Sequence, residues 1–160
     1  MLERAMTLLA RACTVGGALA IAVMMIATCW DIAARWIANA PLHGVVEMVE
    51  IMVLASAMLG LPEAFLRGDQ ITVDVIDGLV PPSILAILKI AATLLSAAFL
   101  TLLLIDVYRP MADAMLFGDV KPDLGVPVYP LYGVIIFGFG ASALACLVTL
   151  LRQLGGGRRR

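Results

Sequence analysis

The chain has 160 residues, of which 62% are hydrophobic and only 14% are charged, and its formal net charge is −1. Soluble domains carry about 25% charged residues, so this composition argues against an ordinary soluble fold. A chain of this length holds about four membrane spans with short connections, which leaves no room for a separate soluble catalytic domain.

Four long apolar segments follow one another along the chain, and the last contains 26 uncharged residues, 126–151. As a helix this run reaches roughly 39 Å, more than the ~30 Å hydrocarbon core of a bilayer. Unpaired backbone groups in lipid cost several kcal/mol each, and the runs are too continuous for the alternating pattern of a β-barrel. We therefore expect an all-α integral membrane protein, with one membrane domain over residues 1–160 and four spans at 12–30, 45–66, 84–107 and 126–151.

The first apolar segment is predicted to be a retained span and not a cleaved signal peptide. Its 19 uncharged residues, 12–30, exceed the usual length of a signal-peptide core. Thr28 before Cys29 also makes a poor lipoprotein-type cleavage site.

The basic residues are unevenly distributed over the two sides of the predicted bundle. With the N-terminus inside, eight lie on the inner side, namely Arg4, Arg11, Arg67, Lys89, Arg152, Arg158, Arg159 and Arg160. The outer side holds three: Arg35, Arg109 and Lys121. Basic residues accumulate on the cytoplasmic side of membrane proteins, so this distribution predicts that both termini are cytoplasmic. The basic C-terminal tail is interpreted as a topology determinant and not as a nucleic-acid site.

Small residues recur at four-residue spacing in three of the spans, a pattern that allows helices to approach closely. They are Gly16, Gly17, Ala20, Ser56, Gly60, Gly138, Ala141, Ser142 and Ala145. The pattern predicts helix packing but leaves open whether the partner helix belongs to this chain or to another.

Two connections carry unusual sequences. Residues 68–82 mix charged and apolar residues, and as a helix they would place apolar and acidic residues on opposite sides, which predicts a short amphipathic segment lying in the membrane interface. An extended stretch over 71–75 fits the same alternation. Residues 108–125 are expected to form a loop on the outer side, either a solvated turn or a docking surface for an external partner.

Charged residues cluster at the ends of the spans. Asp31 and Arg35 are four residues apart, as are Glu63 and Arg67, a spacing that pairs side chains on one helix face. Glu47 and Glu50 are three apart at the outer end of the second span and should face the same way. Such carboxylates point to water, to a cation such as Arg35, or to the protein interior.

The middle of the spans offers little for transport or redox chemistry. Residues 51–62, 90–105 and 133–150 contain no ionisable carboxylate or base, whereas ion-coupled carriers generally need a polar site near the bilayer midplane. His43 is the single histidine, so one chain cannot supply a haem-ligating pair, and the three cysteines include no Cys-x-x-Cys pair. We expect neither a cofactor nor a metal in this chain.

The order of several short motifs resembles a known family. The motifs are Arg35-Trp36, Pro41-Leu42, Glu47, Gly60, Arg67-Gly68-Asp69-Gln70-Ile71-Thr72-Val73-Asp74 and Leu124-Gly125-Val126-Pro127. In this order and spacing they resemble the small membrane subunit of the tripartite ATP-independent periplasmic (TRAP) transporters, the DctQ-like family. The resemblance covers nearly the whole chain, and residues 67–74 are its most specific part.

The resemblance implies a non-enzymatic scaffold subunit in a bacterial inner membrane. The transporter would import organic acids, of the dicarboxylate or sugar-acid type, with a sodium gradient and a periplasmic binding protein. The large permease subunit would hold the substrate and sodium sites, while this chain would brace it and help to receive the binding protein.

Interface and structural roles are therefore expected for Arg35, Glu47, Glu50, Gly60, Arg67, Gly68, Asp69, Asp74 and Pro127. Gly68 would permit a sharp exit from the second span, and the acids after it would hold the interfacial segment at the inner headgroup layer. One alternative is a self-sufficient homo-oligomeric carrier or channel that binds ions with Glu47 and Glu50. Another is a membrane anchor for a redox enzyme, to which the missing histidine pairs are the main objection.

Overall fold

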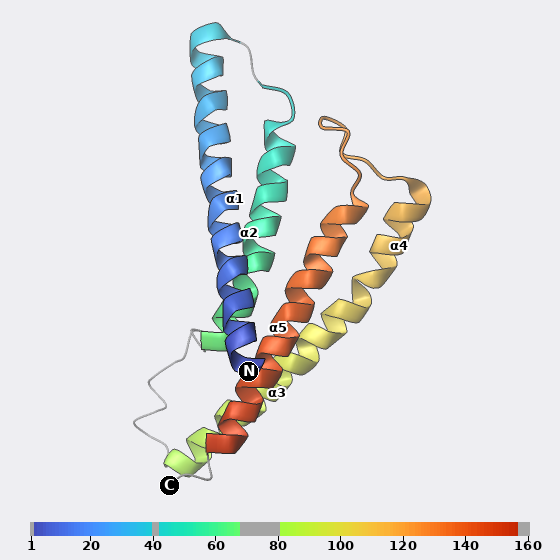
Figure 1. Cartoon of the computed structure of the whole chain (residues 1–160). Helices are drawn as coiled ribbons and strands as arrows, with labels where there is room; N and C mark the ends of the chain where they lie inside the picture. The colour runs from blue at the N-terminus through green and yellow to red at the C-terminus, as the bar shows by residue number, and fades with distance from the viewer. Residues whose placement is uncertain (1, 40–41, 68–80, 157–160) are drawn as a thin grey trace.

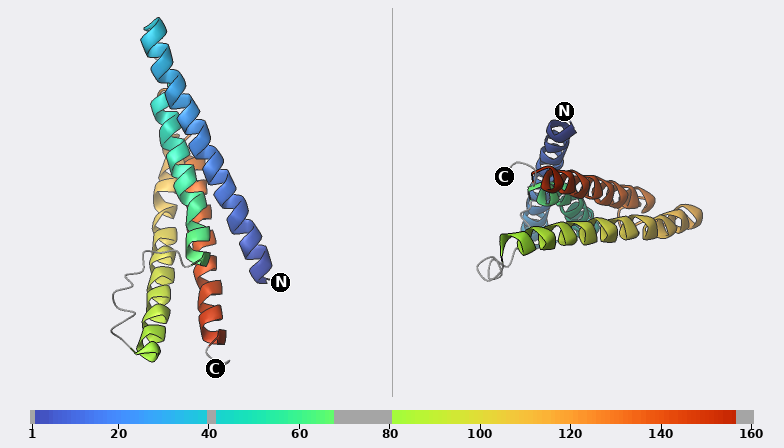
Figure 2. Two further views of the ribbon diagram at one scale, coloured as in Figure 1. Left: turned by 90° about the vertical axis from the view of Figure 1, so that its left-hand side faces the viewer. Right: turned by 90° about the horizontal axis from the view of Figure 1, so that it is seen from below.

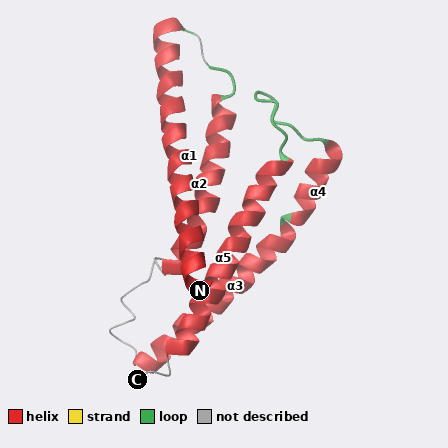
Figure 3. Cartoon of the chain, in the orientation of Figure 1, coloured by secondary structure: helices red, strands yellow, loops and turns green. Residues whose placement is uncertain are grey.

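The computed structural model describes residues 2–39, 42–67 and 81–156, and within these ranges it contains helices and loops but no strand (Figure 1, Figure 3). The helices are α1 (Leu2–Ala38), α2 (Val45–Arg67), α3 (Pro82–Asp106), α4 (Tyr108–Phe117) and α5 (Tyr129–Gly156). Four stretches are long and apolar enough to cross a membrane: Met6–Ile37, Val45–Arg67, Ile87–Phe117 and Tyr129–Gln153. The predicted all-α fold with four membrane-spanning helices is confirmed. The predicted interfacial segment falls almost entirely on residues 68–80, which lie outside the described residues.

The first helix is much longer than its predicted span. It contains 37 residues and at ~1.5 Å per residue reaches roughly 55 Å, well beyond the hydrocarbon core. The prediction stopped at Trp30 because charged residues follow, but Asp31 and Arg35 can extend a helix into the headgroup layer and the water beyond. The helix ends where Asn39 adopts a left-handed conformation with φ of 48°.

The predicted outer loop is wrong for its first ten residues, because α4 continues the path of α3 after a single non-helical residue, Val107. Pro110 explains the interruption: it has no N–H to offer the Asp106 carbonyl, and its ring crowds that carbonyl. The bonds from Val107 N to Leu103 O (3.0 Å) and from Met111 N to Val107 O (3.3 Å) carry the backbone through the break. The last helix begins at Tyr129 and not at residue 126, since residues 126–128 belong to the preceding loop.

Helix α2 packs against both α1 and α5, and α5 in turn packs against α3 and α4. The views from two further sides show the same arrangement, with α5 alongside α3 and α4 (Figure 2). The N-terminus of α1 and the C-terminus of α5 lie at one end of the bundle (Figure 1), which we call the proximal end; the opposite end is the distal end.

Small residues make the two contacts of α2, so the stripes predicted from sequence pack within this chain. A Cβ atom on Gly17 of α1 would lie 3.1 Å from the Ser56 carbonyl oxygen of α2. On Gly138 of α5 it would lie only 2.8 Å from both the Cβ atom and the carbonyl oxygen of Met58. Gly60 behaves differently, since no described atom of another helix lies within 4 Å of its Cβ position.

The contact of Gly138 with Met58 lies where α2 lacks a backbone hydrogen bond. Pro62 is buried inside α2 and has no N–H, so it cannot bond to the Met58 carbonyl four residues earlier. The backbone of α5 approaches this carbonyl at Gly138. On α5, the fully buried Ser142 donates its hydroxyl hydrogen to the Gly138 carbonyl oxygen at 2.7 Å, so a polar side chain is satisfied within the packed face.

Polar side chains add further links between helices near the proximal end. The Thr149 hydroxyl of α5 shares its one hydrogen between the Phe65 carbonyl oxygen of α2, at 3.3 Å, and the Ala145 carbonyl oxygen of its own helix, at 3.0 Å. The Gln153 amide nitrogen donates to the Thr93 hydroxyl at 3.3 Å and joins α5 to α3.

The chain buries little of its apolar surface in itself. Buried residues make up 17% of the most apolar stretch of α1, 11% in α2, 6% in the α3–α4 span and 33% in α5. Large side chains such as Trp36, Leu95 and Phe99 are 90%, 73% and 60% exposed. The helix bundle is thin, and its outer faces must contact lipid or another protein.

We predict that Gly138→Ala destabilises the fold, because the new methyl group meets backbone atoms of α2 that cannot move without shifting the helix. Overpacking of this kind costs about 1–3 kcal/mol. Gly140→Ala is the matched control, since nothing lies within 4 Å of its Cβ position. Thermal unfolding of the purified protein in detergent should show a lower midpoint for the first variant alone. Equal midpoints for both variants would contradict the close α2–α5 contact.

Candidate functional site

The loop between α4 and α5 folds back on itself at the distal end. Lys121 N donates to Val126 O at 2.9 Å, and Val128 N donates to Asp119 O at 2.9 Å. These bonds flank an antiparallel bridge between Val120 and Pro127. Such a flanked pair exchanges no backbone hydrogen bond of its own, so Pro127 occupies a position where its missing N–H leaves no acceptor unsatisfied.

Glu47 holds this loop against the beginning of α2. Glu47 is 8% exposed, and its two carboxylate oxygens accept hydrogen bonds from the backbone N–H groups of Asp123 (3.3 Å) and Leu124 (2.9 Å). Hydrogen bonds to an ionised acceptor contribute about 1.5–3 kcal/mol each. A carboxylate in the first turn of a helix is also favoured by the helix dipole.

Gly44 and Glu50 complete the contact on either side of Glu47. Gly44 has a φ of 78°, and a Cβ atom there would lie 2.7 Å from a methyl carbon of Leu124. Glycine is therefore required both by the backbone conformation and by the close approach of the loop. One turn further along α2, the Glu50 carboxylate pairs with the Lys121 ammonium at 2.6 Å. We call Gly44, Glu47, Glu50 and residues 119–128 the loop clasp.

A second buried carboxylate ties the distal end of α1 to the connection that follows it. Asp31 is 6% exposed; one oxygen accepts a hydrogen bond from Leu42 N at 3.0 Å, and the other accepts one from Arg35 Nε at 2.7 Å. The predicted pairing of Asp31 with Arg35 is present. Arg35 forms its ion pair with Asp31, whereas the partners of Glu47 and Glu50 lie in the loop between α4 and α5.

The structure thus brings together three of the predicted site residues, Glu47, Glu50 and Pro127, in the loop clasp. Arg35 pairs with Asp31 on α1, and Gly60 lies on α2; neither belongs to the clasp. Arg67 pairs with Glu63 at the proximal end of α2, as the spacing predicted. Gly68, Asp69 and Asp74 lie outside the described residues.

Two functional features were missed at the sequence level. The buried Asp31 bonds to Leu42 across eleven residues, and the acceptor role of Glu47 reaches the backbone more than seventy residues away. A partial signal was present for Glu47, because a carboxylate in a first helical turn is favoured by the helix dipole and by the unbonded N–H groups there. The sequence around Glu47 does not indicate which distant loop supplies the N–H groups.

The polar groups of the loop clasp have a structural role, because they hold the loop against α2. Both oxygens of Glu47 accept backbone N–H groups, and Glu50 is neutralised by Lys121. Within residues 2–39, 42–67 and 81–156, no group of three His, Cys, Asp or Glu side chains is arranged to hold a metal ion.

We predict that Glu47→Gln loosens the loop. An amide has one acceptor oxygen, so one of the two bonds is lost and an NH₂ group faces a backbone N–H. Hydrogen–deuterium exchange in a peptide covering residues 119–128 should accelerate by about tenfold or more. Glu50→Gln is the matched control, because Glu50 has a 64% exposed side chain and such pairs contribute only about 0–1 kcal/mol. Similar exchange rates in the two variants would contradict the role of Glu47, and unchanged exchange in α5 would show that the bundle remains folded.

Comparison with known families identifies the chain. The family model described as "Tripartite ATP-independent periplasmic transporters, DctQ component" matches residues 24–156, which include the distal part of α1, all of α2 to α5 and the whole loop clasp. No curated protein matches the chain closely enough to count as a relative. The match covers well over half of the 160 residues, and the described part of the fold has four helices long and apolar enough to cross a membrane. The chain therefore belongs to the DctQ family, the small permease component of the TRAP transporters.

Proposed function

We propose that this chain is a static scaffold subunit that braces a large permease subunit in the bacterial inner membrane. The family works with a large permease and a periplasmic binding protein in TRAP systems. The transporter is proposed to import an organic acid, of the dicarboxylate or sugar-acid type, with a sodium gradient. Substrate and sodium would be bound by the large subunit and not by this chain.

The observation that carries the bracing role is the small share of apolar surface that the chain buries in itself. Only 6% of the most apolar stretch of the α3–α4 span is buried. Leu95, Phe99 and Leu102 share one face of α3 and are 73%, 60% and 65% exposed. Such a face is available to pack against helices of another subunit, while the small-residue stripes are already used between α1, α2 and α5.

The absence of a midplane charge supports a role without substrate transport. The central residues 51–62, 90–105 and 133–150 contain no ionisable carboxylate or base. Binding of an organic acid or of sodium within the bilayer generally needs polar groups near the midplane. The alternative carrier, with Glu47 and Glu50 as ion ligands, has no observation in its favour, because both carboxylates already have protein partners in the loop clasp.

The distribution of charge supports cytoplasmic termini. Arg11, Arg67 and Arg152 line one pocket at the proximal end, whereas Arg35 and Lys121 lie at the distal end. If the proximal end is cytoplasmic, the loop clasp faces the periplasm. There it would present a firmly held surface, including the exposed Asp119 and Asp123, to the binding protein.

We predict that the chain, tagged at its C-terminus and extracted gently from its native membrane, purifies with a stoichiometric multi-span permease. Mass spectrometry of the purified complex identifies the partner. If Glu47 positions the distal surface, Glu47→Gln should reduce uptake or the yield of the complex, while Glu50→Gln serves as the matched control. Recovery of the chain alone as a stable homo-oligomer that transports in liposomes would contradict the scaffold role.

Topology gives an independent prediction. A fluorescent protein fused to the C-terminus should fluoresce, because it folds in the cytoplasm. Alkaline phosphatase fused after Gly118, beyond the third span, should be active, because it needs the periplasm. The reverse pattern of fluorescence and phosphatase activity would invert the proposed orientation.

A further inference from the structure

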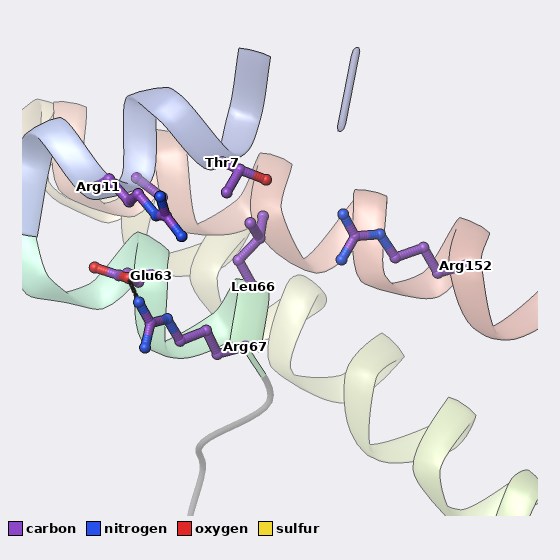
Figure 4. A pocket seen from close by; sticks show the side chains of 7 residues that line it. Thr7, Arg11, Glu63, Leu66, Arg67 and Arg152 are labelled. Carbon is purple, nitrogen blue, oxygen red and sulfur yellow. Dashed lines mark ion pairs between the residues drawn. The ribbon is translucent and has the colours of Figure 1, made fainter. Parts of the chain in front are cut away.

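A charged pocket opens at the proximal end between α1, α2 and α5. Its volume is about 580 Å³, and four of its lining residues are Arg11, Glu63, Arg67 and Arg152. Figure 4 shows Arg11 reaching in from α1, Arg67 lying beside Glu63 on α2, and the guanidinium of Arg152 pointing toward the pocket from α5. Three helices therefore contribute one arginine each to a single site.

Among the described residues that line the pocket, cations outnumber anions. They include three arginines and one glutamate. Glu63 forms an ion pair with Arg67 on α2, and Arg11 lines the same pocket from α1. Arg152 points into the pocket from α5, on the side opposite Arg11. Guanidinium groups favour phosphate because their planar N–H donors match its oxygens.

Apolar surface adjoins the charged pocket on α1. Leu8 and Val15 lie three residues before and four residues after Arg11, a spacing that places all three on one helix face. Leu8 is 69% and Val15 is 61% exposed, and Leu19, one turn further toward the bilayer centre, is 62% exposed. A ligand with both a phosphate and a hydrocarbon chain would match this combination, whereas a free anion would use the charged part alone.

The level of the pocket along the bundle points to the headgroup layer. Arg67 is the last residue of the α2 span, and Arg152 is next to the end of the α5 span at Gln153. Basic pockets between the ends of membrane helices are suited to acidic headgroups.

We propose that Arg11, Arg67 and Arg152 bind the phosphodiester headgroup of an anionic phospholipid, whose acyl chain follows the exposed apolar face of α1. The bound lipid bridges α1, α2 and α5 at the proximal end, opposite the loop clasp. The site goes beyond the proposed scaffold function and does not depend on the identity of the permease or of the transported substrate.

The test is native mass spectrometry of the full chain, in the complex in which it purifies, after titration with phosphatidylglycerol or with phosphatidylcholine of the same acyl chains. The wild type should retain phosphatidylglycerol in clear preference to phosphatidylcholine. Arg11→Gln and Arg152→Gln should each weaken phosphatidylglycerol retention by about fivefold, the effect of roughly one headgroup-level basic residue. Arg152→Lys keeps the charge and should recover part of the binding.

Lys89→Gln is the matched control, because it removes one exposed positive charge from the proximal part of α3 but does not line the pocket. An equal loss in this variant would overturn the proposal in favour of general surface attraction. Displacement of phosphatidylglycerol by millimolar inorganic phosphate would show a site for free anions and would overturn the lipid assignment. Equal retention of both lipids by the wild type would also overturn it. Thermal unfolding of each variant confirms that a loss of binding is not a loss of fold.

Discussion

The close backbone contact between α2 and α5 is the constraint on which the rest of the bundle depends. Lipid is as apolar as the helices, so helix association in a membrane relies on packing and hydrogen bonds and not on hydrophobic burial. Gly138 allows α5 to reach the Met58 carbonyl, which Pro62 leaves without its usual partner within α2. Helix α2 also receives α1 at Gly17. Helices α3 and α4 pack against α5, so their positions depend on the contact of α5 with α2.

Two buried carboxylates set the arrangement of the distal end. Burying a carboxylate is costly unless hydrogen bonds compensate for lost water, so Asp31 and Glu47 are stable only where backbone N–H groups are supplied to them. Leu42 supplies one to Asp31, while Asp123 and Leu124 supply two to Glu47. This requirement connects the end of α1, the beginning of α2 and the α4–α5 loop into one surface. A surface held in this way suits the proposed role of a static scaffold.

The proximal end is organised by arginines. The same positive charges that favour a cytoplasmic location meet in space, because the ends of α1, α2 and α5 converge around one pocket. The same arginine side chains then favour a cytoplasmic location and bind the proposed lipid. Protein hydrogen bonds join helices at both ends, and the proximal end also has the pocket in which the proposed lipid would contact α1, α2 and α5.

The sequence by itself determined the features that depend on composition and short spacing. Long apolar runs require helices in lipid, so the all-α fold and the bounds of the second span at residues 45–66 followed directly, and the observed helix is Val45–Arg67. The pairs Asp31–Arg35 and Glu63–Arg67 followed from the helical repeat, because residues four apart share a face. The length of α1 and the helix after Val107 did not follow, since hydropathy marks where lipid ends and not where a helix ends.

Only the tertiary structure decided which partners these elements meet. The small-residue stripes could have packed on any helix, and the fold assigns Gly17 and Gly138 to α2, while no described atom of another helix lies within 4 Å of the Gly60 Cβ position. Glu47 and Glu50 were recognisable as carboxylates at a helix end, but their partners lie about seventy residues away in the chain. Arg11, Arg67 and Arg152 likewise form a pocket only because three distant helices end side by side. Local patterns specify a helix and its faces, whereas the identity of the neighbour depends on how the whole chain packs.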